Sequence, residues 1–313
     1  MSATKKNGYL YFAGRVLLLL GFVYVLDLLV GNVLRYFYFK EEAGREYRAT
    51  YAMEKTKADV LIFGASRAYR SYVPDIIEDS LKLSCYNTGM HGQSILYSYA
   101  TLKVILKRYT PKVIILDLVP DELKISQDSY DRLAFLLPYY KEHKEIRPII
   151  NLKSPFEKYK LLSSIYPFNS ELIVIAGGNL NFIKKGYVDM KGYKPETGVY
   201  NRPIETITPQ PYPVDSVKIS YYRSFIRECQ QAGIKLFIVY APTFVKYTET
   251  DYTVSVIKQI AKEENAWFAD YTNHPYFISH PELFSDHVHL NGSGAETFTP
   301  MIMHEIKKEL KKP

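Results

Sequence analysis

Cysteine is scarce in this 313-residue chain, and nothing in the sequence resembles a metal-binding pattern. The two cysteines, Cys85 and Cys229, are too few for a disulfide framework. No set of cysteines and histidines has zinc or iron–sulfur spacing, so we expect no metal and no other cofactor. Each cysteine lies within or beside an expected helix or strand, where a buried free thiol is the ordinary role.

A block of basic residues is also missing, although the formal net charge is +7. The lysines and arginines are scattered, and no basic run is interleaved with aromatic residues. Because nucleic-acid binding needs a clustered positive footprint, we do not expect a nucleic acid as partner. Tyrosine is abundant, with 29 residues, and we interpret most of them as compositional bias.

One long apolar run lies near the start of the chain. Residues 16–34 read "VLLLLGFVYVLDLLVGNVL" and contain a single charge, Asp27. At about 1.5 Å per residue, such a helix nearly spans a hydrocarbon core of about 30 Å. A cleaved signal peptide is disfavoured because the run is long and no small-x-small site follows it. A buried core helix is the other alternative, and Asp27 argues for it or for a partner helix.

The orientation of this span does not follow from charge alone. Lys5, Lys6 and Arg15 precede the run, and Arg35 with other basic residues follows it, so the positive-inside rule does not choose. We therefore expect residues 1–40 to form a membrane anchor, with the amino terminus inside on functional grounds given below. Residues 41–57 are charged and polar, and they predict a helical or flexible stalk.

Apolar strands alternate with helical patterns from residue 58 onward. The stretches "VLIFGAS", "PKVIILDL" and "IKLFIVYAP" are strands without polar alternation, and each is followed by helical periodicity. Such strands indicate a parallel sheet covered by helices on both faces. Residues 126–215 break this rhythm with short helical patterns and a turn-rich stretch. We interpret them as an insertion, packed over one edge of the sheet, in an α/β domain of residues 58–313.

A serine stands where the first strand ends, in "VLIFGASRAYR". A serine attacks an ester only if a base accepts its proton, and the base needs a third group to orient it. Near the end of the chain, "DHVHLN" places Asp286 three residues before His289. Parallel strands bring their carboxyl ends to one edge of a sheet. The pattern therefore predicts that Ser66, His289 and Asp286 meet there.

Each of these residues also has a structural alternative. Ser66 fits a plain strand-to-helix turn, and His287 competes with His289 as the base. Asp286 fits a cap of the last helix, although Asn291 or Ser293 lies closer to the helical run. The three-residue spacing from Asp286 favours His289.

Three stretches resemble the sequence blocks of the SGNH/GDSL hydrolase superfamily. The family's G-D-S appears as Gly64-Ala65-Ser66, its N-x-x-x-x-G-x-[ST] as residues 87–94, and its D-x-x-H as residues 286–289. The resemblance covers residues 58–121 and 216–312. It implies a flavodoxin-like three-layer sandwich with a parallel sheet.

The resemblance also implies roles for individual residues. Ser66 would be the nucleophile, His289 the base and Asp286 its orienter, with the N–H groups of Ser66 and Gly92 as the oxyanion hole. The family often has an asparagine donor after the third strand, where this chain has Asp121. An ionised carboxylate cannot donate a hydrogen bond, so another group is needed.

Four residues near these blocks are further candidates for the site. Gln93 and Arg67 are candidates for the missing oxyanion donor. Arg67 also fits contact with an acidic polymer, and His91 fits either a substrate contact or a surface role. We expect Asn87 to fix its loop through side-chain hydrogen bonds rather than to touch a substrate.

From these features we expect a serine esterase or O-acyl(acetyl)transferase anchored in a bacterial cytoplasmic membrane by a single pass. Its carboxyl-terminal domain would be extracytoplasmic and would act on a cell-surface or exported glycan through an acyl-enzyme. The layout resembles membrane-anchored SGNH-like proteins associated with polysaccharide acetylation, which implies a membrane-bound O-acyltransferase as partner. The presence of Asp121 where the family often has an asparagine favours an alternative, a non-catalytic glycan-binding or scaffold module. The anchor favours another, a lipid esterase.

Overall fold

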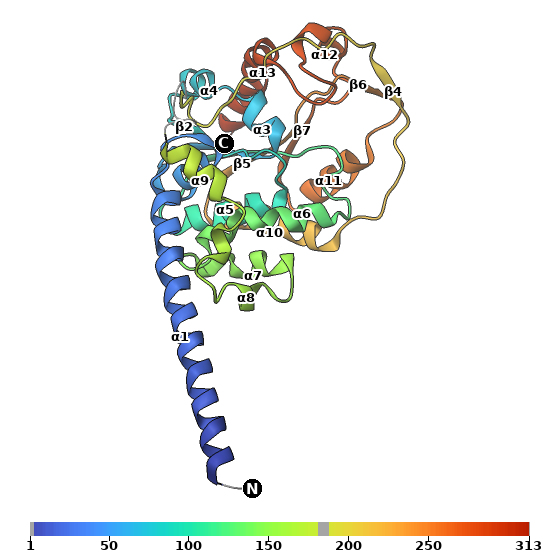
Figure 1. The fold of residues 1–313 in the computed structure, drawn as a ribbon. Coiled ribbons are helices and arrows are strands. Elements are labelled where there is room, and N and C mark those ends of the chain that lie inside the picture. Colours follow the sequence, from blue (N-terminus) through green and yellow to red (C-terminus); the bar gives the residue numbers. More distant parts are fainter. Residues whose placement is uncertain (1–2, 181–187, 313) are drawn as a thin grey trace. The chain divides into compact units, whose positions relative to one another are not determined.

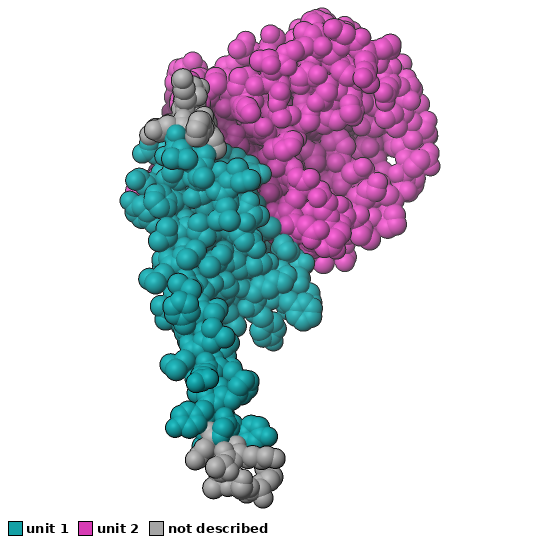
Figure 2. Space-filling model, in the orientation of Figure 1, with its two compact units in different colours: residues 1–46, 134–187 teal, residues 47–133, 188–313 magenta. Residues whose placement is uncertain are grey.

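The computed structural model describes residues 3–180 and 188–312, so residues 181–187 of the expected insertion lie outside the described residues. The chain forms two compact units, which Figure 2 distinguishes by colour. Unit 1 comprises residues 1–46 and 134–187, and unit 2 comprises residues 47–133 and 188–313. The middle of the expected insertion therefore belongs to the same unit as the apolar amino-terminal segment.

Unit 2 is built on a parallel sheet. Its strands are β1 (Val60–Gly64), β2 (Cys85–Asn87), β3 (Val113–Asp117), β5 (Lys235–Tyr240) and β7 (Trp267–Asp270), in the order β2-β1-β3-β5-β7. This is the flavodoxin-like order, and it confirms the predicted parallel α/β class. Every residue of β1 and β3 is buried, which explains why their sequences lack polar alternation.

Helices cover both faces of this sheet (Figure 1). Val60 and Ile62 pack on one face with Phe298, whereas Leu61 and Phe63 pack on the other with Phe225. This alternation within a single strand creates two separate cores and hence three layers. The first face carries α3 (Ser66–Ser71), α4 (Pro74–Leu81), α12 (Pro275–Ile278) and α13 (Gly292–Leu310); the second carries α5 (Ile95–Leu106), α10 (Ser216–Gln231) and α11 (Tyr252–Glu263).

Side-chain caps mark where several helices begin. Asp215 caps α10 and Asp251 caps α11, each accepting a hydrogen bond from a backbone N–H in the first turn. Asn291 caps α13 by accepting from Gly294 N at 3.0 Å. The predicted cap at Asn291 is confirmed, so Asp286 is not the cap of α13.

The expected stalk is helical and part of the folded body. It contains α2 (Gly44–Thr50) and a π-helical turn, Tyr51–Lys55. Ala52 and Met53 of this turn are buried, and Ala52 belongs to the core cluster that includes α5. Residues 51–55 therefore pack in the core of unit 2, and the helical alternative predicted for this stretch is the one observed.

The elements described in residues 126–215 are short. β4 (Glu205–Ile207) pairs in parallel with β6 (Val245–Tyr247), which lies outside this range, and the other elements are brief helices. The helices are α6 (Gln127–Asp131), α7 (Arg147–Ile150), α8 (Glu157–Lys160) and α9 (Leu172–Asn179), with 3₁₀ turns at Arg132–Tyr139, Lys144–Ile146, Asn151–Lys153 and Tyr166–Phe168; a further 3₁₀ turn, Pro281–Leu283, precedes α13.

Unit 1 joins the long helix α1 (Ala3–Phe39) to the brief helices of residues 134–180. Aromatic rings pack together in its core: the Tyr38 ring lies 6.2 Å from that of Tyr139 and 5.6 Å from that of Phe168. Within α1, residues 8–39 are long and apolar enough to cross a membrane, and a signal sequence would have the same character.

Candidate active site

Ser66 lies at the carboxyl edge of the sheet, where α3 begins after β1. Gly64 ends β1 with φ +138, and a Cβ built on it would lie 2.3 Å from the carbonyl oxygen of Asp117 on β3. Only glycine fits this close approach of two backbones. The small Gly64-Ala65 pair thus lets the chain turn sharply and set Ser66 as the first residue of α3.

The structure brings Ser66, His289 and Asp286 together. Ser66 Oγ lies 2.7 Å from His289 Nε2, and His289 Nδ1 lies 2.8 Å from Asp286 Oδ2. Asp286 Oδ1 also accepts from the backbone N–H groups of Val288, at 2.7 Å, and His289, at 2.9 Å. These two bonds fold residues 286–289 into a tight turn, so the carboxylate and the imidazole are held by one local structure.

The electrostatics of this turn favour an ionised carboxylate. Burial opposes the ionisation of Asp286, but hydrogen bonds from the His289 side chain and from the Val288 backbone outweigh it and lower its pKa to about 2. An ionised Asp286 only accepts, so it favours the tautomer with a proton on His289 Nδ1. His289 Nε2 is then left to accept the proton of the Ser66 hydroxyl.

A cleft of about 510 Å³ opens at Ser66. Its walls come from the loops that follow β1, β2 and β3 and from the turn that carries His289. Besides Ser66 and His289, the lining residues are Ala65, Gly92, Gln93, Ser94, Val119, Pro120, Asp121, Glu122, Lys124, Ile125, Ser126, Ser129, Lys218 and Val288. Polar and apolar side chains thus line the cleft beside the nucleophile, at the edge where parallel α/β sheets bind ligands.

Gly92 lies in this cleft in a conformation that favours glycine. Its φ is +71, and a Cβ there would lie 2.2 Å from Nη1 of Arg132. The Arg132 guanidinium therefore occupies the space that a side chain at this position would need. The oxyanion role that the resemblance implies for Gly92 remains a prediction.

Arg67 lies behind the nucleophile and not in the cleft. It is fully buried, and its Nη2 donates to Asp117 Oδ1 at 3.0 Å and to the carbonyl of Leu118 at 2.9 Å. Its guanidinium carbon lies 4.3 Å from the centre of the Tyr240 ring. Arg67 is therefore placed neither to contact a polymer nor to replace the missing oxyanion donor.

The three candidates within residues 87–94 lie in different places. Asn87 is buried, donates to the carbonyl of Ala68 at 2.9 Å and accepts from Gly89 N at 3.0 Å, so it holds its loop. Gln93 lines the cleft, and its amide lies 3.4 Å from the carbonyl of Arg132. His91 is exposed and is not among the lining residues of the cleft.

Asp121 lines the cleft on the loop after β3. Its φ is +59, and its side chain is 62% exposed and lies 3.7 Å from Lys124 Nζ. The residue that stands where the family has a donor is therefore a solvated carboxylate beside the site. Gln93 remains the candidate donor among the residues named from the sequence.

Two buried charged residues that line the cleft, Glu122 and Lys218, were not predicted from the sequence. Glu122 accepts from Ile95 N at 2.7 Å, and Lys218 Nζ donates to Ser129 Oγ and to the carbonyl of Lys124, each at 2.8 Å. Burial raises the pKa of Glu122 to about 7 and lowers that of Lys218. Glu122 directly follows Asp121, a signal that could have found it, whereas Lys218 lies within a helical pattern and offered none.

The raised pKa of Glu122 predicts a stability difference that depends on pH. Between its ordinary pKa of 4.5 and about 7, the folded state binds more protons at this site than the unfolded state, so stability should fall as pH rises. Glu122→Gln should remove this part of the fall. Melting temperatures of both proteins between pH 4.5 and 8 test it. Parallel profiles would show that Glu122 does not titrate in this range.

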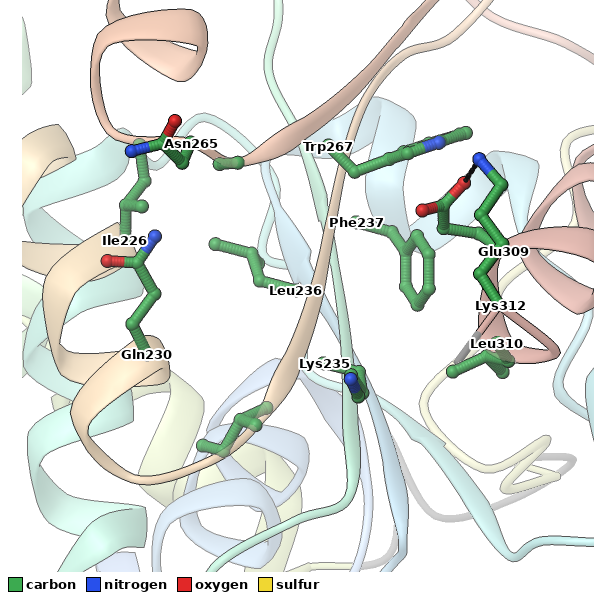
Figure 3. Close-up of a pocket in the computed structure, with 12 residues that line it drawn as sticks. Ile226, Gln230, Lys235, Leu236, Phe237, Asn265, Trp267, Glu309, Leu310 and Lys312 are labelled. Atoms are coloured by element: carbon green, nitrogen blue, oxygen red, sulfur yellow. Dashed lines mark hydrogen bonds and ion pairs between the residues drawn. The ribbon is translucent and has the colours of Figure 1, made fainter.

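A second cavity of unit 2, of about 330 Å³, lies at the opposite edge of the sheet, where β5 and β7 begin (Figure 3). Trp267 and Phe237 form part of its wall, and Glu309 and Lys312 pair beside them. Its lining residues include no serine, cysteine, threonine or histidine, so the cavity has no counterpart of the Ser66–His289 pair. Among the described residues, no cluster of histidine, cysteine and acidic side chains is arranged to hold a metal.

Comparison with known proteins gives only distant structural similarity. No family model matches the chain, and no curated protein matches it. Matching solved structures include SGNH/GDSL hydrolases and acetyl xylan esterases. The acetylxylan esterase Axe2 of Geobacillus stearothermophilus is 13% identical with a TM-score of 0.39, over 80% of this chain and 94% of that chain.

Two further matches have similar values. A protein of Bacteroides fragilis assigned as an acylhydrolase is 13% identical with a TM-score of 0.42, over 87% of this chain and 100% of that chain. A protein of Desulfitobacterium hafniense assigned to the G-D-S-L family is 10% identical with a TM-score of 0.38, over 78% of this chain and 97% of that chain.

Proposed function

We propose that this protein is a membrane-anchored serine esterase or O-acyltransferase that acts on an ester of a cell-surface or exported glycan. The observation that carries the proposal is the 2.7 Å contact of Ser66 Oγ with His289 Nε2, backed by Asp286 on the other ring nitrogen. Nucleophile, base and orienter in this order are the parts that acyl transfer through a serine requires.

The proposed chemistry has two halves that share an acyl-enzyme. Ser66 Oγ attacks the acyl carbon while His289 Nε2 takes the hydroxyl proton, and Asp286 stabilises the resulting imidazolium. The N–H groups of Ser66 and Gly92 would hold the oxyanion. The alkoxide leaves with the proton of His289. Water or a sugar hydroxyl then gives its proton to His289 and attacks the acyl carbon. His289 Nε2 returns this proton to Ser66 Oγ as the bond between Oγ and the acyl carbon breaks, which restores the free serine.

The substrate class is inferred from the cleft. Gln93, Asp121, Lys124, Ser126 and Ser129 line it with side chains that can exchange hydrogen bonds with sugar hydroxyls. The solvated carboxylate of Asp121 is the observation that favours the second candidate, a glycan-binding or scaffold module without catalysis.

A fluorophosphonate probe tests the catalytic proposal on the full chain in detergent. The probe reacts with an activated serine, so we expect labelling of wild-type protein at Ser66 and none in Ser66→Ala. Ser126→Ala, which removes another serine of the same cleft, is the matched control and should still be labelled. Glycan binding by an unlabelled wild-type protein would favour the module instead.

The location proposed for the protein is a bacterial cytoplasmic membrane, crossed once by α1, with the carboxyl-terminal domain outside. A membrane-bound O-acyltransferase would be the partner that supplies acyl groups if the reaction is transfer. A reporter fused after the last residue should read as extracytoplasmic, and the chain should stay in the membrane fraction at high salt. Release by salt alone would contradict a spanning anchor.

Asp121→Asn tests whether the oxyanion hole lacks a donor. One such donor contributes about 10²–10³-fold in rate, so an asparagine at this position should raise kcat by up to roughly 10²-fold if the hole is incomplete. Asp121→Ala is the control, because it removes the charge without adding a donor. Equal rates in both variants would mean that another group, such as Gln93, already fills the position.

A further inference from the structure

The brief helices of unit 1 carry an exposed apolar surface beside the long helix α1. Within seven residues of each other, Phe156 is 63% exposed, Tyr159 is 60% exposed and Leu162 is 75% exposed. Lys158 is also exposed, and its Nζ lies 4.9 Å from the centre of the Tyr159 ring. Exposed aromatic and aliphatic side chains next to lysines are typical of surfaces that lie in a membrane interface.

The segment that presents these side chains, residues 153–168, is held in shape by one carboxylate. Glu157 is fully buried and accepts from Lys160 Nζ and from the Tyr166 hydroxyl, each at 2.8 Å. Lys153 Nζ lies 3.4 Å from the same carboxylate. The exposed side chains therefore stand on an ordered scaffold, and their exposure is not that of a loose loop.

The same segment is fixed to α1 at Asp27. The carboxylate of Asp27 accepts from Ser163 Oγ, at 2.5 Å, and from Ser164 N, at 2.6 Å. Four residues further along α1, a Cβ on Gly31 would lie 2.4 Å from Ser164, so the two backbones touch. Leu162 directly precedes Ser163, so Leu162 lies close to the level of Asp27 along the axis of α1.

The position of Asp27 fixes how the helix can lie in a bilayer. Residues 8–26 of α1 are exposed, and Asp27 is held by Ser163 and Ser164. A span of residues 12–30 would cover about 28 Å, close to a hydrocarbon core of about 30 Å. It would put Arg15 about one turn inside one boundary, from where its side chain can reach the headgroups. Asp27 would lie about one turn inside the other boundary, with its oxygens satisfied by Ser163 and Ser164.

A span of residues 16–34, as the sequence predicts, fits less well. Asp27 would then lie about 10 Å below the boundary at about 1.5 Å per residue. Lys141 Nζ donates to Ser164 Oγ at 2.9 Å, so Lys141 would lie deeper in the membrane together with Ser164. Arg35 and Glu142, which pair at 2.9 Å, would come to the edge of the hydrocarbon. Charges at that depth are costly.

We propose that residues 153–168 insert into the membrane interface at the Asp27 end of the span. Phe156, Tyr159 and Leu162 would enter the boundary between headgroups and acyl chains, and Lys158 would meet anionic headgroups. The inference rests on the anchoring proposed above and adds that unit 1 lies on the lipid surface. The partner is the bilayer itself, and its chemistry is an apolar layer beneath a layer of negative charge.

Depth-dependent quenching tests this on the full chain in nanodiscs that contain phosphatidylglycerol. Single cysteines at Leu162→Cys, Leu20→Cys and Glu142→Cys would each carry a small fluorophore; native Cys85 and Cys229 are buried and should not react. Leu20 lies near the middle of the proposed span. Glu142 pairs with Arg35, about 12 Å along the helix from Asp27. It is the matched control in the same unit.

The expected pattern separates this proposal from the anchor. A quencher high on the lipid acyl chain should lower the fluorescence at Leu162→Cys about two-fold or more, and a deep quencher should do so at Leu20→Cys, with little change at Glu142→Cys. Quenching at Leu20→Cys alone would leave the anchor intact and overturn the interfacial contact. Quenching at Glu142→Cys would overturn the assigned depth. Quenching at none of the sites would overturn the anchor and, with it, this proposal.

Discussion

Ser66→Ala is expected to lower kcat on a small activated acetyl ester by on the order of 10⁴-fold or more, because it removes the nucleophile. His289→Ala should cost about as much, since Ser66 Oγ then has no base within reach. The double variant should be no slower than either single variant, because members of a triad act as one unit. The full chain in detergent, assayed with each variant's folding checked by circular dichroism, gives the rates.

Asp286→Asn should cost less than either of these changes. It leaves the nucleophile and the base in place and removes only the charge that orients and stabilises the imidazole. His287→Ala is the matched control, because His287 shares the same turn but its side chain is not part of the triad. We expect its rate to stay within about three-fold of wild type, as for other surface changes. Unchanged activity in Ser66→Ala would sink the catalytic proposal and favour the glycan-binding module.

The sheet could be predicted from the sequence because its signals are local. The all-apolar runs of β1, β3 and β5 need both faces covered, and only a parallel sheet between helices provides that. The turn of Asp286 and His289 is also local, since three residues and two backbone hydrogen bonds make it. Placing Ser66 beside them follows from the rule that parallel strands end at the same edge.

What the sequence left open depends on distant contacts. Arg67 looks like a surface charge next to the nucleophile, and only its pairing with Asp117, fifty residues away, shows that it is buried. Lys218 lies in a helix whose sequence does not reveal that its Nζ reaches Ser129. Likewise, Asp27 argued for a buried helix or a partner helix. Its partner is a segment more than 130 residues away in the same chain.

Breaking the buried pair of Arg67 and Asp117 is the second change for which we expect a large effect, here on stability. Asp117 is buried, accepts from Arg67 Nη2 at 3.0 Å and accepts from the Tyr72 hydroxyl at 2.8 Å. Among the described residues, Arg67 Nε and Nη1 have no hydrogen-bond partner, so Asp117 supplies most of the compensation for this buried cation. Asp117→Ala would leave a buried charge unpaired, which costs about 3–5 kcal/mol.

We therefore expect Asp117→Ala to lower the melting temperature by on the order of 10 °C. The double variant Arg67→Met with Asp117→Leu removes both charges and fills the space with apolar atoms, so it should recover much of the loss. Asp79→Ala, which breaks the exposed pair of Asp79 with Lys82, is the control and should leave the melting temperature unchanged. A double variant as unstable as Asp117→Ala would show that the loss comes from Tyr72 and the lost packing, and not from an unpaired Arg67. Because Arg67 is the next residue after Ser66, we also expect Asp117→Ala to weaken fluorophosphonate labelling at temperatures where the protein is still folded.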